Sequence, residues 1–275
     1  MTEYDAFARF EHEGWSDDGT ARSYTDGFAR ASAMCVPALV GGLGLEPGME
    51  ALDLCCGPGI VTAGLLATGA DVTALDFSPA MVELARTRVP DAAVLQGDAA
   101  DLPFGPDSFD AVTIGFGMPH LPDPPTVLAE AHRVLRRGGR IAFSTWEPPA
   151  RSFGFRTVTE ALRQHGDPAV GLPPAPDANA YADPAIAFPA LLAAGFVEPA
   201  AEPVDSHWRL QAPEDFYDLF HGGTVRMGVL MRRQPADHAA AIRQYMAAEV
   251  RTHCTQDDAG RWIVPLPAMV ISARA

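Results

Sequence analysis

Basic side chains are scarce in this chain. Its 275 residues include 20 Lys and Arg against 35 Asp and Glu, which gives a formal net charge of −15 at pH 7. Proteins that bind nucleic acids need a basic stripe that releases counterions from phosphates. The basic residues cluster here only as the pairs Arg136-Arg137 and Arg232-Arg233. The charge balance therefore argues against a nucleic-acid partner and favours a small-molecule substrate.

Cysteine is also rare, with Cys35, the adjacent Cys55 and Cys56, and Cys254. These four residues show no C-x-x-C spacing or other metal-ligand pattern, so we expect no metal site. A disulfide framework is typical of short secreted chains rather than a chain of this length. The cysteine content thus predicts a protein of a reducing compartment, the cytoplasm.

Long apolar runs are missing as well. No run approaches the ~18 residues of a membrane span, and the acidic start MTEYDAFARFEHEG lacks the basic-then-apolar pattern of a secretory leader. We therefore expect no membrane association. The chain is nevertheless 48% hydrophobic, a composition typical of a globular protein that buries a sizeable core.

Short apolar runs alternate with helix-like segments between residues 50 and 147. The apolar runs are ALDLCC, DVTALD, AAVLQGD, FDAVTIGFG and RIAFSTW, and the helical spacing lies in GIVTAGLLATG, SPAMVELARTRV and PPTVLAEAHRVLRRGG. Ser78-Pro79 predicts the start of the second helix. Arg136-Arg137 followed by Gly138-Gly139 predicts the end of the third. This alternation predicts an α/β fold with a mostly parallel sheet covered on both faces.

The flanking regions are less regular. Residues 1–45 have helical character, whereas residues 148–187 are rich in proline and alanine and predict an irregular cap or insertion. A helix returning to a strand at about 196–205 follows. Two helices are expected within 213–252, and a final strand within 261–274.

A glycine loop follows the first apolar run. Gly57-Pro58-Gly59 resembles a dinucleotide loop, and Asp76 lies 19 residues after Gly57, where a ribose-binding acid belongs. However, Thr62 occupies the position of the third glycine or alanine. Asp53 would repel a pyrophosphate at the end of this strand but attract an ammonium group. The ligand that fits is S-adenosylmethionine, which has an amino group there and no phosphate.

Four segments in order resemble the motifs of class I S-adenosylmethionine-dependent methyltransferases, in particular the small-molecule, UbiE-like branch. They are LDLCCGPGIVT, VTALDFSPAMVELAR, LQGDAADLPF and the segment from FDAVTIGFG to RIAFSTW. The resemblance implies an α/β, Rossmann-like seven-stranded sheet of order 3-2-1-4-5-7-6 with the last strand antiparallel. It also implies a single domain over 1–275, with a cofactor-binding core at about 46–147 and helical cap segments at about 1–45, 148–187 and 213–252.

The same resemblance implies the cofactor-binding residues. Asp53 and the glycine loop would hold the methionine part, Asp76 the ribose hydroxyls, and Asp98 the adenine amino group. The full predicted set is Tyr24, Asp53, Cys55, Gly57, Gly59, Asp76, Phe77, Met81, Asp98, Ala99 and Phe116. Simpler roles remain open: Asp53 and Asp76 as helix caps, Asp98 as a turn residue, Met81 as core, and Cys55 as a space-filling residue.

Two histidines are candidate catalytic residues. Methyl transfer from a sulfonium is an in-line displacement that mainly needs geometry and a dry pocket, but an alcohol or phenol acceptor also gains from a general base. His120 lies just past the fourth predicted strand, where ligands bind in open α/β sheets. The alternative is that His120 only lines the cofactor. His221, before Gly222-Gly223, could line the pocket or be an ordinary surface or core histidine. Trp15 and Trp146 join Tyr24 as candidate lid residues.

Subclasses that act on DNA are not favoured. Adenine methylation uses Asp, Asn or Ser followed by two prolines and an aromatic residue, but Asp123-Pro124-Pro125 is followed by Thr126. We therefore expect O-methylation of a small, partly apolar metabolite. A homodimer is compatible with the sequence, which does not determine the oligomeric state. Two alternatives remain: a non-methylating cyclisation or rearrangement on this fold, and an NAD(P)-dependent oxidoreductase. The acceptor itself is not predicted, because the cap segments carry no motif.

Overall fold

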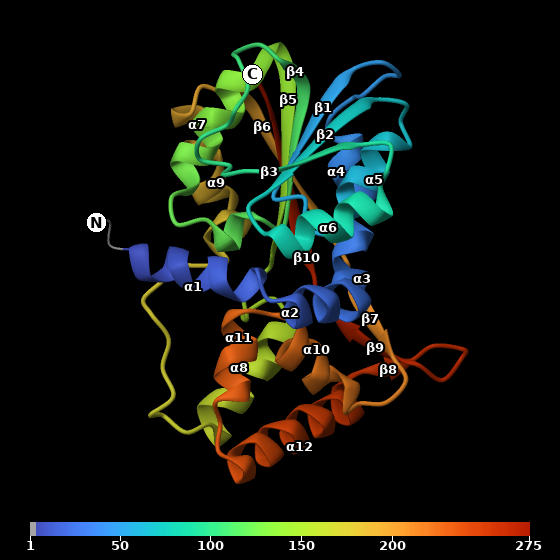
Figure 1. Ribbon diagram of the computed structural model, residues 1–275. Helices are drawn as coiled ribbons and strands as arrows, with labels where there is room; N and C mark the ends of the chain where they lie inside the picture. The colour runs from blue at the N-terminus through green and yellow to red at the C-terminus, as the bar shows by residue number, and fades with distance from the viewer. Residues whose placement is uncertain (1–3) are drawn as a thin grey trace.

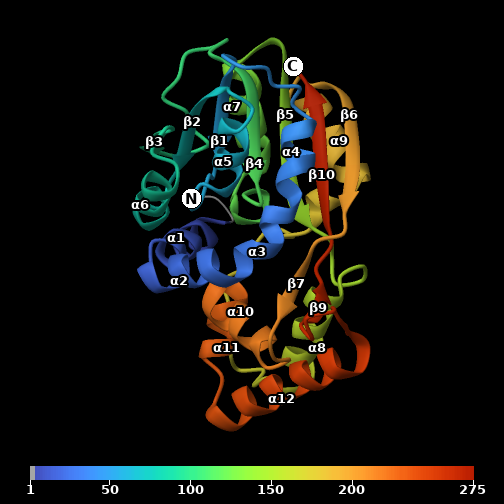
Figure 2. The same ribbon diagram turned by 90° about the vertical axis from the view of Figure 1, so that its right-hand side faces the viewer.

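The computed structural model describes residues 4–275 and contains a seven-stranded sheet of order β3-β2-β1-β4-β5-β10-β6 (Figures 1 and 2). Its strands are β1 (Glu50–Leu54), β2 (Asp71–Asp76), β3 (Ala93–Gln96), β4 (Phe109–Gly115), β5 (Leu135–Trp146), β6 (Val197–Val204) and β10 (Ala268–Arg274). Strands β1 to β5 pair in parallel, whereas β10 runs antiparallel to both of its neighbours, β5 and β6. Because β10 is the last strand of this sheet, the predicted order and the antiparallel last strand are confirmed.

Helices cover both faces of this sheet, which explains why its central strands are continuous apolar runs. One face carries α4 (Val36–Gly41), α5 (Ile60–Leu66) and α6 (Pro79–Arg88), and the other carries α7 (Pro124–Val134) and α9 (Pro184–Ala193) (Figure 1). Helix α6 starts as predicted, since the Ser78 hydroxyl accepts the Met81 N–H at 3.1 Å and Pro79 occupies the first turn.

The predicted end of the third helix is wrong. Helix α7 ends at Val134, and strand β5 begins directly at Leu135. Leu135 is buried and pairs with Phe109 of β4, and the guanidinium of Arg136 bonds Asp110 at 2.7 Å. The cations and glycines that imitate a helix end therefore lie in a strand, because pairing with β4 outweighs the local signal.

Helical segments fill the chain before the sheet, as predicted. They are α1 (Asp5–Trp15), α2 (Asp18–Ser23), the π-helical η1 (Tyr24–Phe28), α3 (Ala29–Ser32) and the 3-10 turn η2 (Ala33–Cys35), which leads into α4. Residues 1–3 lie outside the described residues. Helices α1 and α2 lie below the strand ends of the large sheet, between it and the second group of elements (Figure 1).

This second group forms a lobe on the far side of α1 and α2 (Figures 1 and 2). It contains α8 (Phe153–His165), α10 (Asp215–Gly223), α11 (Arg226–Arg232), α12 (Ala236–His253) and a small antiparallel sheet of β7 (His207–Leu210), β9 (Trp262–Pro265) and β8 (Thr255–Gln256). A short turn, η4 (Ala180–Ala182), precedes α9. We call this group, from α8 and α10 to β9, the cap lobe.

Three expectations for the cap lobe need correction. Residues 148–187 are not irregular throughout, because 153–165 form α8. Residues 213–252 hold three helices rather than two, since α10 ends where Thr224 adopts an extended backbone. The expected final strand is split, with β9 in the small sheet and β10 in the large one. Proline-rich and glycine-rich connections interrupt the hydrophobic periodicity of these elements, so the sequence pattern does not show where each one begins and ends.

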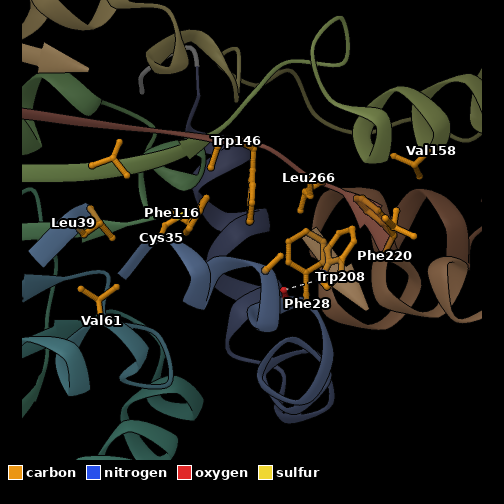
Figure 3. Close-up of a cluster of buried hydrophobic side chains, with 14 of the residues drawn as sticks. Phe28, Cys35, Leu39, Val61, Phe116, Trp146, Val158, Trp208, Phe220 and Leu266 are labelled. Atoms are coloured by element: carbon orange, nitrogen blue, oxygen red, sulfur yellow. Dashed lines mark hydrogen bonds between the residues drawn. The ribbon is translucent and has the colours of Figure 1, made fainter. Parts of the chain in front are cut away.

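A continuous apolar core joins the cap lobe to the sheet (Figure 3). Trp208 of β7 is almost fully buried, and its indole N–H donates to the carbonyl oxygen of Phe28 at 3.0 Å. The Phe28 ring contacts Trp208, Phe220 and Trp146 edge to face. These contacts fix the cap lobe relative to the strand ends. Within residues 4–275, no helix is both long and apolar enough to cross a membrane.

Candidate active site

A cavity of about 610 Å³ lies at the carboxyl ends of β1, β2 and β4. This is the edge at which open α/β sheets bind ligands. Helix α1 and η1 border the cavity through Trp15 and Tyr24, and the cap lobe borders it through Phe155 and Val225. Segments that are far apart in the sequence thus enclose one space.

Most of the predicted site residues line this cavity. They are Tyr24, Asp53, Cys55, Gly57, Asp76, Phe77, Met81, Asp98, Ala99, Phe116 and His120. Gly59 and His221 are not among the lining residues. The structure therefore brings the motif residues together, while their individual roles in binding stay predictions.

Asp53 is fully buried in β1, and both of its carboxylate oxygens accept hydrogen bonds. Thr113, its neighbour on β4, donates to Oδ1 at 2.8 Å, and Thr62 of α5 donates to Oδ2 at 2.6 Å. Burial raises the pKa of Asp53 to about 6, against the two threonine hydrogen bonds, which lower it. Thr62, which is foreign to a dinucleotide loop, thus has a role in supporting this acid. An ammonium group in the cavity would favour the charged form.

Asp76 ends β2 and closes the glycine loop. Its Oδ2 accepts the Gly57 N–H at 2.8 Å and its Oδ1 accepts the Ser78 N–H at 2.9 Å. Burial raises the pKa of this carboxyl. A carboxylate has about four acceptor positions, so Asp76 can still accept two hydroxyl groups from the cavity.

The two loop glycines serve different purposes. Gly57 has φ +53°, and a Cβ added there would meet nothing within 4 Å, so the residue leaves space beside the cavity. Gly59 has φ +80°, and an added Cβ would lie 2.9 Å from Cγ2 of Val89. Gly59 is therefore explained by the packing of the α5 start against α6, and the geometry does not support its predicted contact with a ligand.

The cysteine and aromatic positions near the loop are tightly packed. Burial raises the pKa of the Cys55 thiol well above its usual value, so this residue is not a reactive thiolate. Phe116 has φ +58°, which is uncommon for a non-glycine residue. Its ring stacks on Trp146 at 3.9 Å between centroids (Figure 3). This pair forms an aromatic wall of the cavity.

The amino-terminal segment is attached to the second motif. The Ser78 hydroxyl, which also caps α6, donates to the carbonyl oxygen of Trp15 at 2.7 Å. The Trp15 ring meets Tyr24 edge to face at 5.4 Å, and the Tyr24 hydroxyl lies 3.2 Å from the hydroxyl of Ser32. Trp15, Tyr24 and Trp146, the candidate lid residues, all line the cavity.

His120 ends the 3-10 turn η3 (Met118–His120) that follows β4. Its Nδ1 lies 2.8 Å from Oε2 of Glu11, which comes from α1 and is 2% exposed. The Trp15 indole N–H donates to the same oxygen at 3.1 Å. The histidine side chain is 33% exposed and lines the cavity, so it is placed where a general base could act.

His221 lies apart from this group, in α10. Its ring stacks on Tyr217 at 5.3 Å, and its carbonyl oxygen accepts a hydrogen bond from Arg232. Desolvation lowers its pKa. The structure therefore gives His221 a packing role and does not bring it to the cavity with His120.

Sequence reasoning missed two charged residues of the cavity, Glu11 and Arg226. The spacing of Phe7, Glu11 and Trp15, four residues apart, could have revealed an acid on a buried helix face. Arg226 has no comparable local signal, because tertiary packing alone brings α11 to the cavity.

The charges around the cavity select its ligand. Among the described residues, the carboxylates of Glu11, Asp53, Asp76 and Asp98 line it together with a single guanidinium, that of Arg226. Such a field disfavours a phosphate and suits a cationic ligand with hydroxyl and amino groups. The fold and the site thus define an α/β protein with a nucleoside-type cofactor site that accepts positive charge.

Comparisons with known proteins agree with this class. Residues 52–143 match the family described as a methyltransferase domain. A demethylmenaquinone methyltransferase of Renibacterium salmoninarum is 38% identical over 144 residues, or 52% of this chain and 60% of the relative. One from Beutenbergia cavernae is 44% identical over 127 residues, or 44% and 53%. The matches thus span 53–60% of these relatives' length.

Solved structures share the fold. A Haemonchus contortus phosphoethanolamine N-methyltransferase superposes with a TM-score of 0.57 at 16% identity, over 98% of this chain and 59% of that one. The cyclase SpnF superposes with a TM-score of 0.53 at 16% identity, over 88% and 80%. The matched domain and the curated relatives support the motif resemblance to class I S-adenosylmethionine-dependent methyltransferases of the UbiE-like branch.

Proposed function

We propose that this protein transfers a methyl group from S-adenosylmethionine to an oxygen atom of a small, partly apolar acceptor. The observation that carries this proposal is that one cavity joins the carboxylates of the cofactor motifs to an aromatic wall and to His120. We also propose that residues 1–275 act as one domain, with a core at about 46–147 and the flanking segments enclosing the acceptor.

Each motif residue is suited to one part of S-adenosylmethionine. Asp53 would face the ammonium group, Asp76 would accept the ribose hydroxyls, and Asp98 with Ala99 would meet the adenine. Met81 and Phe77 supply apolar surface beside them. When bound, S-adenosylmethionine would supply an electrophilic methyl group on a positively charged sulfur, which leaves as a neutral thioether.

The remaining lining suits a flat, apolar acceptor. Phe28, Phe116, Trp146 and Phe155 line the cavity, and aromatic walls favour ring-shaped ligands. Figure 3 shows Phe28, Phe116 and Trp146 within the apolar core that reaches the cap lobe. His120 would take the proton of the acceptor hydroxyl as the oxygen–carbon bond forms. A dry, aromatic pocket holds the acceptor in line with the methyl group.

The relatives favour a second candidate acceptor. Both of the relatives above are named demethylmenaquinone methyltransferases, which points to a quinone-type ring. A non-methylating cyclisation is a third reading, since the cyclase SpnF shares the fold and a fold does not fix the chemistry. A nicotinamide reaction is disfavoured by the acidic cavity.

Two measurements test the proposal. Calorimetric titration should show binding of S-adenosylmethionine and none of NADH, and the reverse result would refute the cofactor assignment. Mass spectrometry with a panel of phenols, alcohols and demethylmenaquinone-type quinones should then show a product heavier by one methylene. Fragmentation locates the new methyl group on oxygen or on ring carbon. A rearranged product of unchanged mass would support the cyclisation instead.

A further inference from the structure

We infer that Glu11, on the amino-terminal helix α1, is the positioning residue of His120: it holds the Nδ1–H and leaves Nε2 to take the acceptor's proton. This inference rests on the proposed function and deepens it, because it assigns the base its orientation and its counter-charge. The first motif and the glycine loop make no hydrogen bond to the His120 ring.

The hydrogen bonds around Glu11 fix the tautomer of His120. The Trp15 indole nitrogen can only donate, and it lies 3.1 Å from Oε2 of Glu11 and 3.4 Å from Nδ1 of His120. The carboxylate oxygen is the nearer acceptor and carries the negative charge, so the indole N–H bonds Glu11 rather than the histidine. Nδ1 of His120 lies 2.8 Å from the same oxygen. An unprotonated Nδ1 would oppose its lone pair to the carboxylate, so the proton belongs on Nδ1. Nε2 then carries the lone pair that a general base requires.

The burial of Glu11 indicates more than a packing role. A carboxylate at 2% exposure, on the same helix face as Phe7 and Trp15, is costly unless it is paired. Asp53, which serves the cofactor motif, has both oxygens bound by threonines. Oε1 of Glu11 has no hydrogen-bond partner within residues 4–275. Glu11 thus directs one oxygen to His120 and Trp15 and lacks the full set of bonds expected of a purely structural acid.

Several other charged groups surround the pair. The charge of His120 lowers the pKa of Asp76, at the end of β2, but burial has the larger effect and raises it overall. Arg226, on α11, is desolvated, which lowers its pKa, and the charge of Glu11 opposes this effect. His12, Asp53 and Asp98 line the same cavity. Among these groups, Glu11 alone is hydrogen-bonded to the His120 ring.

The position of Glu11 is tied to the cofactor motif. The Ser78 hydroxyl bonds the carbonyl oxygen of Trp15, one turn after Glu11, and also caps α6. The His12 ring stacks on Phe77 at 5.3 Å. These contacts place the carboxylate where the loop after β4 presents His120. The sequence separation of 109 residues is bridged by this attachment.

The step balances without any further reactant. The acceptor's O–H proton moves to Nε2 of His120, the oxygen–carbon bond forms, and the carbon–sulfur bond breaks with its electron pair going to sulfur. The imidazolium that results faces the carboxylate of Glu11, which stabilises its positive charge. The neutral amide of Glu11→Gln would keep the shape and lose this stabilisation.

The test compares Glu11→Gln, His120→Ala and the double variant with Glu13→Gln, a matched control on the exposed side of α1. We expect Glu11→Gln to lower kcat by about 10²-fold, with little change in KM or in affinity for S-adenosylmethionine. The pH profile of kcat should change shape, because an amide supplies no counter-charge to the imidazolium that forms during the reaction. Glu13→Gln should behave as the parent protein.

The double variant tests whether Glu11 acts through His120 or whether the two residues contribute independently to kcat. If Glu11 acts through His120, the double variant is no slower than His120→Ala. Effects that multiply, or a Glu11→Gln profile of unchanged shape, would overturn the inference. So would a loss confined to affinity for S-adenosylmethionine.

A second measurement needs neither a variant nor an acceptor. Nitrogen NMR of the full chain with S-adenosylmethionine should show the His120 ring protonated at Nδ1 and not at Nε2. The opposite tautomer would overturn the role of Glu11 even if methyl transfer is confirmed. If the expected tautomer is found but no acceptor is methylated, the positioning role stands and the proposed function fails.

Discussion

The two sides of the cavity are built in different ways. The cofactor side comes from consecutive strand ends within residues 52–143, the region that matches the methyltransferase family. The acceptor side is assembled from α1, the β4–α7 connection and the cap lobe, and its contact between Glu11 and His120 joins residues 109 positions apart. In the proposed function, local motifs would bind the cofactor, whereas tertiary packing would select the acceptor.

The largest expected effect lies on the acceptor side. His120→Ala should lower turnover by roughly 10²-fold to 10⁴-fold, the usual contribution of a general base, while S-adenosylmethionine affinity stays within a few-fold. Steady-state kinetics and calorimetry on the same preparation measure both. Equal losses of turnover and of cofactor affinity would instead show that His120 lines the cofactor site. His120 would then belong to the cofactor side of the cavity and not to the acceptor side.

The next effect lies on the cofactor side. Asp76→Ala should weaken S-adenosylmethionine binding by about 10-fold to 10²-fold, because hydrogen bonds to a charged group contribute roughly 1.5–3 kcal/mol. The KM of the acceptor should change little. Calorimetry provides the test, and an unchanged cofactor affinity would remove Asp76 from the site.

The acids of the cofactor side show how much of the site the sequence could predict. Asp76 and Asp53 stand at fixed places in motifs that local strand and turn chemistry creates, and the sheet order follows from the same alternation. Glu11 was missed because its significance depends on a partner 109 residues away. The small sheet was missed because a single apolar stretch, 262–274, divides between two sheets. Leu135 was misassigned because a strand partner outweighs a helix-end signal.

A pH measurement examines the buried acid of the cofactor side. The pKa of Asp53 rises from 3.8 to about 6 in the folded protein without cofactor. Since the folded state holds this proton more tightly, its stabilising effect is present below pH 4 and is lost as the pH rises through 6. The expected change is about 3 kcal/mol.

Denaturation of the parent protein and of Asp53→Asn between pH 4 and pH 7 measures this slope. The difference in unfolding free energy between the two proteins should vary over that range, because asparagine does not titrate. Bound S-adenosylmethionine should reduce the variation, since its ammonium favours the ionised acid. Identical pH dependence in the two proteins would contradict the assignment.

The smallest effect belongs to His221, which was expected at the site from sequence and lies outside it. His221→Ala should leave turnover within about twofold and reduce stability by about 0.5–1.5 kcal/mol through the lost stacking on Tyr217. Kinetics and thermal unfolding give both values. A loss of turnover comparable to that of His120→Ala would return this residue to the acceptor side.

The place of β10 in the large sheet has a consequence for how the chain folds during synthesis. Residues 268–274 lie between β5 and β6 and pair with both. The ribosome therefore synthesises β6 and the whole cap lobe before it makes the strand that β6 pairs with. Until those seven residues emerge, the facing edges of β5 and β6 stay open, so the sheet closes late and through contacts of long sequence separation. Protection of β6 amides from hydrogen exchange on stalled nascent chains should begin only when β10 is outside the tunnel.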